Sequence, residues 1–404
     1  MLAGWLGLRR YLIRRATVVT PTCVLRRGYV AIEGDTIVGV GEEPPPRGFE
    51  GFDEVSLEGY VVGPGFVDTH IHGALGIDLS TASPGEVEEL SRGLPRFGVT
   101  SFIPTSVALP QEALRAFCRS VASAREVPGG ARVAGVHLEG PYINPARAGA
   151  QNPRNMRDAS LEEFEGLLAE CGGLLRAITV APEVRGVREL IGYAVSKGVV
   201  VQVGHTDATY SETEEAIALG ASKATHLYNA MSAFHHRSPG AVLALLRARD
   251  VYLELIVDFV HVAPEVVDFT IEHASYRRVV LVSDSISATG MPDGRYRLGD
   301  TEVEVIAGVA RTVDTRALAG STLTLDKAFA NVVSLSYGLD EAFYMSSLAP
   351  ALSLGLTWRL GIGALRPGFK ADIVVLDPKD LSVAATIVGG VAGYVREDLR
   401  HLLT

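Results

Sequence analysis

Short apolar runs alternate with longer stretches of helical spacing from Pro64 to about residue 360. This alternation predicts repeated βα units whose strands form a parallel sheet. The intervening stretches, such as SPGEVEELSRGL and YSETEEAIALGA, space their apolar residues as amphipathic helices do. Eight runs read as strands: FVDTHIH (66–72), VTSFIPTS (99–106), RVAGVHLEG (132–140), LRAITVAPE (175–183), VVVQVGHT (199–206), KATHLYN (223–229), YLELIVDFVH (252–261) and VVLVSDSI (279–286).

Eight βα units between residues 64 and 360 predict an α/β protein built on a (β/α)8 TIM barrel. Such a barrel typically takes about 250 residues plus insertions. An open doubly wound sheet is the competing fold. That fold normally carries a glycine-rich phosphate turn after its first strand, and no such turn follows residues 66–72. The barrel is therefore the expected fold.

The two ends of the chain have a different pattern, with short β-branched runs broken by Gly and Pro clusters. Residues 11–62 contain LIRRATVV, YVAIEGDTIVGVG and DEVSLEGYVV, and ADIVVLD at 371–377 has the same β-branched character. Such runs predict strands, and the two ends can pair into one small β domain beside the barrel. The expected parts are residues 10–63 and 361–404 for the small β domain and 64–360 for the barrel.

Composition narrows the class of protein. The 404 residues include 47% hydrophobic and 21% charged residues, a globular mixture that argues against disorder. Lys and Arg number 37 against 47 Asp and Glu, a net charge of −10. Nucleic-acid binding needs a basic footprint, so we expect no nucleic-acid partner.

The cysteines and apolar stretches bear on location. The three cysteines, Cys23, Cys118 and Cys171, stand far apart, which predicts free thiols in a reducing compartment and excludes a disulfide framework. No stretch reaches the roughly 20 apolar residues that cross a bilayer, so we expect no membrane partner. The apolar segment Met1–Leu8 is too short for a signal sequence, and strand-like order is expected only from about Tyr11. We therefore predict a cytoplasmic protein.

Side chains that can bind a metal stand where the predicted strands end. In a (β/α)8 barrel, the carboxyl ends of all strands meet at one rim, where catalytic groups lie. Five of the eight runs bring such a side chain to that rim. These residues are His70, His72, Glu139, His205, His226 and Asp284.

Each of these residues has a simpler explanation when it is taken alone. Glu139 can cap a helix or form a loop salt bridge, and His205, His226 or Asp284 can be a hydrogen-bonded core residue. The pair His70 and His72 lies on one face of its strand, because side chains alternate with a period of two. A shared metal centre explains all five strand ends together. His137, deeper on the Glu139 strand, is expected to support the site by hydrogen bonding rather than as a ligand.

Other histidines fall outside this set. His235 and His236 precede Arg237 in a loop, and this basic patch can hold a phosphate, although an isolated run of this kind is more often a solvated loop. His261 ends the seventh run and faces the same rim. His273 and His401 are expected to pack at the surface.

Several segments together resemble the amidohydrolase superfamily and, within it, the N-acetylglucosamine-6-phosphate deacetylase family. They occur in family order and cover almost the whole chain. THLYNAM and HLEGP are fairly specific to the deacetylases, whereas PGFVDTHIHG and RPGFKADIVVLD mark only the superfamily. The segments are PGFVDTHIHG (64–73), GVHLEGPYINPARAGAQNP (135–153), VGHTDATYSE (203–212), THLYNAM (225–231), RSPG (237–240), LVSDSISATG (281–290), LAGSTLTLDKA (318–328) and LRPGFKADIVVLD (365–377).

The resemblance implies a role for each residue of the site. It assigns the principal divalent metal to Glu139, His205 and His226, and a second ion to His70 and His72. Asp284 matches the catalytic aspartate. The substrate-binding residues that it implies are Asn229 and Ala230 through their backbone, His261, and Arg237, which reaches the phosphate from a neighbouring subunit. A homodimer follows from that last assignment.

The implied activity is metal-dependent hydrolysis of the N-acetyl amide of N-acetylglucosamine-6-phosphate, with one or two ions of zinc, iron, cobalt or manganese per subunit. Two departures keep the substrate open. Gln151 stands where the family usually has a histidine that polarises the acyl carbonyl, so it is a candidate carbonyl donor without charge. Phe259 stands where the family usually has glycine. The alternatives are an amidohydrolase for another N-acyl or cyclic amide, and a non-catalytic binding protein on the same barrel.

Overall fold

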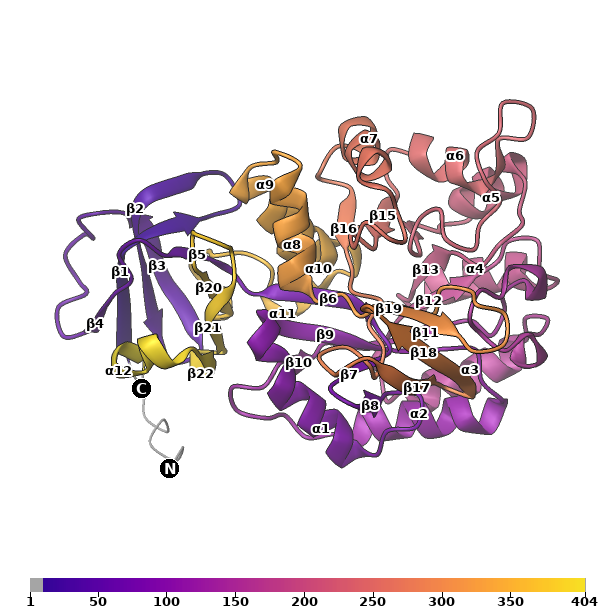
Figure 1. Cartoon of the computed structure of the whole chain (residues 1–404), viewed down its shortest axis with the longest axis horizontal. Helices are drawn as coiled ribbons and strands as arrows, with labels where there is room; N and C mark the ends of the chain where they lie inside the picture. Colours follow the sequence, from indigo (N-terminus) through magenta and orange to yellow (C-terminus); the bar gives the residue numbers. More distant parts are fainter. Residues whose placement is uncertain (1–9, 404) are drawn as a thin grey trace.

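The computed structural model describes residues 10–403. The apolar segment Met1–Leu8, set aside above as too short for a signal sequence, lies outside the described residues. The chain divides into a small β sheet on the left of Figure 1 and a larger α/β body beside it. Within residues 10–403, no helix is both long enough and apolar enough to cross a membrane.

The larger body is the predicted parallel barrel. Each of the eight runs contains a strand, and the strands pair in parallel in an order that follows the sequence. A parallel bridge between Ile71 and Ser285 joins the first strand to the segment after the last and closes the barrel. The barrel strands are β6 (Phe66–Ile71), β9 (Val99–Ser106), β11 (Val136–Glu139), β12 (Leu175–Val180), β13 (Val200–Val203), β14 (Lys223–Ala224), β15 (Tyr252–Leu255) and β16 (Val279–Leu281), with the short β10 (Arg132–Val133) at the edge of β9.

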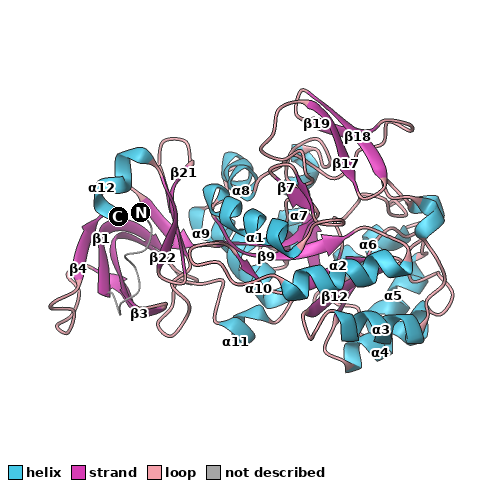
Figure 2. Cartoon of the chain, turned by 90° about the horizontal axis from the view of Figure 1, so that it is seen from below, coloured by secondary structure: helices cyan, strands magenta, loops and turns pink. Residues whose placement is uncertain are grey.

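Helices cover the outside of the barrel (Figure 2). Their apolar sides face the strands, and capping boxes at Ser83 and Thr209 satisfy the first backbone N–H groups of two of them. The helices are α1 (Pro84–Gly93), α2 (Gln111–Ser123), α3 (Leu161–Glu170), α4 (Val187–Ser196), α5 (Tyr210–Ala218), α6 (Gly240–Arg247), α7 (Pro264–Ala274) and α8 (Leu325–Ser334), followed by the short α9 (Leu339–Phe343), α10 (Ala349–Ser353) and α11 (Leu356–Leu360). The last helix, α12 (Arg400–Leu403), lies at the small sheet instead (Figure 1).

A three-stranded antiparallel sheet, which the pattern of βα units does not predict, follows the eighth barrel strand. It consists of β17 (Gly294–Leu298), β18 (Thr301–Ile306) and β19 (Val309–Thr312). Figure 2 shows this sheet projecting from the barrel as a separate flap. Two short strands, β7 (Gly73–Ala74) and β8 (Ile77–Asp78), form a further ribbon directly after the first barrel strand.

The small sheet joins the two ends of the chain, as predicted. Antiparallel pairing of β20 with β5 connects the C-terminal strands to the N-terminal ones. The sheet encloses its own apolar core, which includes Ile13, Val30 and Ile373. The boundaries at residues 64 and 360 stay a prediction. The strands are β1 (Arg10–Val19), β2 (Val24–Glu33), β3 (Thr36–Glu42), β4 (Asp53–Ser56), β5 (Val61–Pro64), β20 (Ile373–Leu376), β21 (Val383–Val388) and β22 (Val391–Val395).

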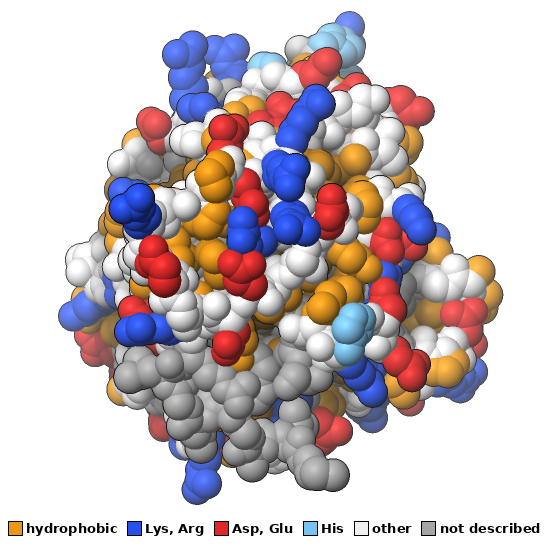
Figure 3. Space-filling model, turned by 90° about the vertical axis from the view of Figure 1, so that its left-hand side faces the viewer, with side chains coloured by type: hydrophobic (Ala, Val, Ile, Leu, Met, Phe, Trp, Pro, Cys, Tyr) orange, Lys and Arg blue, Asp and Glu red, His pale blue; other side chains and the backbone are white. Residues whose placement is uncertain are grey.

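A buried ion pair ties the small sheet to the barrel. Arg132 of β10 donates to Asp372 at 2.8 Å, and the side chain of Asp372 is 3% exposed. Asp372 also accepts the backbone N–H groups of Gly65 and Gly389, so it connects both parts of the chain. On the face that carries the small sheet, Lys and Arg side chains are interspersed with Asp and Glu (Figure 3).

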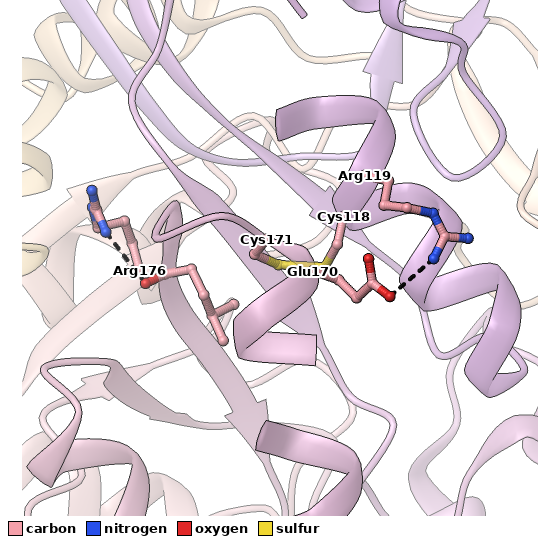
Figure 4. The surroundings of a disulfide bond; sticks show 6 residues. Cys118, Arg119, Glu170, Cys171 and Arg176 are labelled. Carbon is pink, nitrogen blue, oxygen red and sulfur yellow. Dashed lines mark hydrogen bonds and ion pairs between the residues drawn. A yellow bond between two sulfur atoms is a disulfide. The ribbon is translucent and has the colours of Figure 1, made fainter. Parts of the chain in front are cut away.

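The expectation of three free thiols is wrong for two of the cysteines. Cys118 on α2 and Cys171 at the end of α3 form a disulfide, with their Cα atoms 4.5 Å apart (Figure 4). The two cysteines are 53 residues apart, so no local sequence pattern indicated that they pair. The chain between them forms one complete βα unit, and the barrel places the two neighbouring outer helices side by side. Cys23 is free and exposed. Free thiols therefore no longer support the prediction of a reducing compartment.

Candidate metal centre and active site

The six strand-end residues gather at one mouth of the barrel, as the sequence predicted. All six are buried, with exposed fractions of 0–6%. They form two groups whose ligand atoms lie within 4.8 Å of one another. The first group is Glu139, His205 and His226, and the second is His70, His72 and Asp284.

The first group brings three potential ligand atoms close together. Glu139 Oε1 lies 2.8 Å from His226 Nε2 and 3.1 Å from His205 Nε2, and the two Nε2 atoms are 3.2 Å apart. His205 Nδ1 donates to the Arg147 carbonyl at 2.8 Å, which leaves its Nε2 as the free acceptor. Two imidazoles and one carboxylate at such distances are a donor set suited to a divalent transition metal.

The second group is built in the same way. Asp284 Oδ1 lies 3.1 Å from His72 Nε2 and 3.4 Å from His70 Nε2. His72 Nδ1 donates to the Thr105 carbonyl, so its Nε2 faces the group. Glu139 reaches this group too, with Oε1 at 3.5 Å from His70 Nε2 and Oε2 at 3.4 Å from His72 Nε2. One carboxylate therefore stands between both groups and can bridge two ions.

The electrostatics of the mouth favour a cation. Burial raises the pKa of Glu139, but His205 and His70 outweigh it and hold that pKa well below its usual value. Burial is likewise outweighed at Asp284, where His70 and His72 lower the pKa. Burial lowers the pKa of His72, whereas hydrogen bonds with Asp284 and Glu139 raise it, to about 10. The carboxylates thus stay negatively charged and favour protonation of the neighbouring imidazoles. A divalent ion would supply the same positive charge.

A cavity of about 350 Å³ opens over both groups. Of the predicted substrate-binding residues, Gln151, Asn229, Ala230 and His261 line it. Asp258 accepts the Nδ1–H of His261 at 2.6 Å, and this contact fixes the orientation of the His261 ring at the cavity wall. The cavity is large enough for a sugar-sized ligand.

Gln151 is held with its amide nitrogen toward the metal-binding groups. Its Oε1 accepts the backbone N–H of Ala108 at 2.6 Å, and its Nε2 donates to Glu139 Oε2 at 2.6 Å. Because Ala108 holds the Oε1 atom, the Nε2 end of the Gln151 amide is the end that points into the cavity. The NH₂ group therefore lies at the cavity wall beside Glu139, with His205 Nε2 3.4 Å away.

Two other predicted positions lie apart from the cavity wall. Phe259 adopts φ 61°, in the left-handed region that favours glycine, and its side chain packs against the barrel core. Arg237 lies in an exposed loop, where its N–H donates to His235 Nδ1 at 3.3 Å. Among the described residues that line the cavity, neither appears. Arg237 thus does not reach the site of its own chain.

His137 has the supporting contacts that its position predicted. It is fully buried, with Nε2 at 2.8 Å from Thr179 Oγ1 and Nδ1 at 3.3 Å from Thr105 Oγ1. Lys223 and Glu254, two fully buried charged residues behind His70, were not predicted from the sequence. The signal that could have found them is a charged residue inside an otherwise apolar barrel strand.

A barrel with metal-binding groups at the carboxyl ends of its strands is the architecture of a metal-dependent hydrolase class, and the family comparison agrees. The amidohydrolase family model matches residues 61–393, so the chain belongs to the amidohydrolase family. This membership confirms the superfamily resemblance found in the sequence.

Within this family, the chain is similar to individual sugar-phosphate deacetylases. The chain is 39% identical over 317 residues to N-acetylgalactosamine-6-phosphate deacetylase of Escherichia coli O157:H7, covering 78% of this chain and 83% of that one. It is 35% identical to N-acetylglucosamine-6-phosphate deacetylase of Vibrio furnissii, covering 88% and 90%. A solved structure of N-acetyl-D-glucosamine-6-phosphate deacetylase from Mycobacterium smegmatis, a mutant in complex with N-acetyl-D-glucosamine-6-phosphate, matches with a TM-score of 0.89 and 37% identity over 96% of this chain and 100% of that one.

Proposed function

We propose that the chain is a metal-dependent deacetylase that hydrolyses N-acetylglucosamine-6-phosphate to glucosamine-6-phosphate and acetate. The observation that carries the proposal is the meeting of two metal-binding groups, one of which includes Asp284, at one cavity. The names of the relatives support the substrate class. The chain covers 90% and 100% of the length of two of these relatives, so the comparison extends over both of their parts.

In this proposal Glu139, His205 and His226 hold the principal ion, and His70 and His72 hold a second ion. Zinc, iron, cobalt and manganese all suit imidazole and carboxylate ligands. A bound divalent ion supplies a water whose pKa falls from 15.7 to about 7 and a Lewis acid for the acyl carbonyl.

The protein's own residues move the proton and orient the substrate. Asp284, ionised and held by His72, accepts the proton of the attacking water and passes it to the amide nitrogen, since an amine must leave protonated. The Gln151 amide N–H donates to the carbonyl oxygen. His261, oriented by Asp258, contacts a sugar hydroxyl, and the backbone of Asn229 and Ala230 faces the phosphate.

The phosphate also needs a cation. We propose that Arg237 of a second subunit supplies it, so that the active form is a homodimer. The exposure of Arg237, remote from its own cavity, supports this arrangement. Replacing Arg237 with Ala should weaken binding of the phosphorylated substrate far more than binding of its dephosphorylated form. Equal effects on both would remove the phosphate assignment. A cytoplasmic location stays a prediction.

A second candidate substrate is N-acetylgalactosamine-6-phosphate, because one relative with 39% identity bears that name. The two sugars differ only at the C4 hydroxyl. Acetate release should be measured with both sugar phosphates, the free sugars, an N-acetyl amino acid and a cyclic amide, each with defined metals. We expect kcat/KM to be highest for N-acetylglucosamine-6-phosphate. A higher value for any other compound would replace the proposed substrate, and no turnover with stoichiometric metal would favour the binding-protein alternative.

A further inference from the structure

A buried ion pair lies directly behind the metal-binding groups. Lys223 of β14 and Glu254 of β15 are both fully buried inside the barrel, with Lys223 Nζ 2.7 Å from Glu254 Oε1. Taking two charges out of water is costly, and apolar residues of similar volume are often at least as stable in such a place. Neither residue lines the cavity, so neither has a contact with substrate to explain it.

The contacts of the pair lead to both metal-binding groups. One carboxylate oxygen, Glu254 Oε2, accepts the Nδ1–H of His70 at 2.9 Å and the backbone N–H of His226 at 3.2 Å. These two histidines belong to different groups. Lys223 Nζ donates to Thr69 Oγ1 at 2.9 Å, next to His70 in the chain. The pair thus contacts both strands that carry these histidines.

We propose that Lys223 and Glu254 are positioning residues that set the geometry and affinity of the second metal site. Glu254 holds the His70 proton on Nδ1, so that Nε2 faces Asp284 and Glu139 as a ligand. A carboxylate behind a metal-binding imidazole also increases its basicity. Lys223 balances the buried carboxylate when no ion is present. The inference rests on the proposed role of His70 as a ligand.

Replacement of Glu254 and replacement of Lys223 should have opposite effects on metal binding. Without Glu254, His70 loses its oriented acceptor, so the second ion should bind more weakly. Without Lys223, the buried carboxylate of Glu254 keeps the N–H groups of His70 and His226 as donors but loses its cationic partner. An ion on His70 supplies the missing positive charge, so metal binding should stabilise this variant more than it stabilises the wild type.

The test is a metal titration of chelator-treated full-length protein with Co²⁺, followed by stoichiometry, visible absorption and the shift of Tm on metal addition. In Glu254→Gln, we expect the second ion to bind about 10–100-fold more weakly, with a smaller Tm shift. In Lys223→Met, we expect a lower Tm without metal and a larger Tm shift. The double variant Lys223→Met/Glu254→Gln leaves no unpaired charge and keeps the test valid if a single variant does not fold. It should still bind the second ion at least about tenfold more weakly than the wild type.

Two control variants distinguish a failure of the proposed ligand role of His70 from a failure of the positioning role of Lys223 and Glu254. Asp372→Asn disrupts another buried ion pair, Arg132–Asp372, which lies at the small sheet; it should lower Tm without changing metal affinity. His70→Ala should abolish the second ion while the first ion still binds. If His70→Ala binds metal as the wild type does, the proposed ligand role of His70 fails. If His70→Ala loses the second ion but Glu254→Gln and the double variant keep wild-type affinity, the positioning role of the pair is overturned.

Discussion

Three residues of the metal-binding groups leave their strands through left-handed backbone. His205, His226 and Asp284 have φ values of 47°, 28° and 49°. This region costs a residue with a Cβ atom about 1–2 kcal/mol, and it persists only where the surroundings enforce it. At Asp284 the enforcing bond runs from its N–H to the His70 carbonyl at 2.9 Å. The strain turns each side chain inward across the mouth of the barrel.

Asp284→Asn tests the proton transfer at the least structural cost, because asparagine tolerates left-handed backbone well. An amide cannot accept the water proton, so we expect kcat to fall by about 10²–10⁴-fold, with the ion held by Glu139, His205 and His226 retained. Steady-state assays together with metal analysis of the same preparation measure both quantities. Full turnover with metal bound would show that another group transfers the proton.

At this scale, the sequence revealed the residues that stand at strand ends. His70, Glu139 and His205 could be grouped because the barrel brings all carboxyl ends to one rim. Glu254 and Lys223 could not be placed in the same way. Barrel strands are buried on both faces, so the sequence alone does not reveal whether a charged residue points inward. Arg237 is different again, because its proposed contact needs a second chain.

Among the elements, the β17–β19 sheet holds the loop that carries Gln151. Asp300 Oδ2, in the β17–β18 turn, accepts from Asn152 Nδ2 at 2.6 Å and Asn155 Nδ2 at 3.2 Å. Alternation in TEVEVI and the turns Gly299-Asp300 and Ala307-Gly308 mark these strands in the sequence. A repeated βα pattern predicts only parallel strands joined by helices, so it does not predict an antiparallel insertion of this kind.

Asp300→Ala should free this loop. We expect kcat/KM to fall about tenfold, the effect of about 1–2 kcal/mol in lost hydrogen bonds, while metal content stays unchanged. Hydrogen exchange should rise in residues 148–155. Asp314→Ala, in the exposed loop after β19, is the matched control and should leave both measurements unchanged. Unaltered exchange in Asp300→Ala would show that the loop keeps its shape without this sheet.

The disulfide between α2 and α3 should contribute to stability. Closing a loop with a 53-residue separation typically adds about 2–4 kcal/mol to the free energy of unfolding. Alkylation in denaturant should label one thiol before reduction and three after it, and the reduced protein should unfold at lower temperature. Cys23→Ser, which removes the exposed thiol, should leave Tm unchanged. Three reactive thiols in the untreated protein would contradict the pairing.

A bidentate ion pair stabilises the bulge in β1. Both carboxylate oxygens of Glu43 accept from Arg14, at 2.9 and 3.1 Å, and Oε1 also accepts the Arg15 N–H. These hydrogen bonds from Arg14 lower the pKa of Glu43 below its ordinary value of 4.5. A lowered pKa means that this stability is fully present above pH 4.5 and is lost as the pH falls through the folded-state pKa.

Glu43→Gln should therefore lower the free energy of unfolding by about 1 kcal/mol at pH 7. The difference from wild type should stay constant down to about pH 5 and close below it, because protonation then removes the charge from wild-type Glu43 as well. Urea unfolding at a series of pH values measures this difference. A gap that persists at pH 3 would mean that the charge is not its source.

At the scale of the whole molecule, the small sheet fixes where the barrel begins. Only Gly65 separates β5 of the sheet from β6, the strand that carries His70. The Gly65 N–H donates to the Asp372 carbonyl at 3.0 Å, so the C-terminal part of the chain holds this junction. The pairing of both ends could be predicted from their shared β-branched pattern. The buried Arg132–Asp372 contact could not, because it joins residues 240 positions apart that no local pattern connects.

Asp372→Ala tests whether this contact unites the two parts. Removal of the carboxylate leaves the largely buried Arg132 with only the more distant Glu126, at 3.7 Å, as an acidic partner. Breaking a buried pair typically costs about 3–5 kcal/mol. The free energy of unfolding should fall by about 3 kcal/mol, with metal content and kcat at 25 °C unchanged because the site lies at the other end of β6. If the sheet and the barrel are coupled through Asp372, unfolding of the variant should separate into two transitions by calorimetry. A single transition at the wild-type temperature would assign the coupling to the strand β5 and the apolar contacts instead.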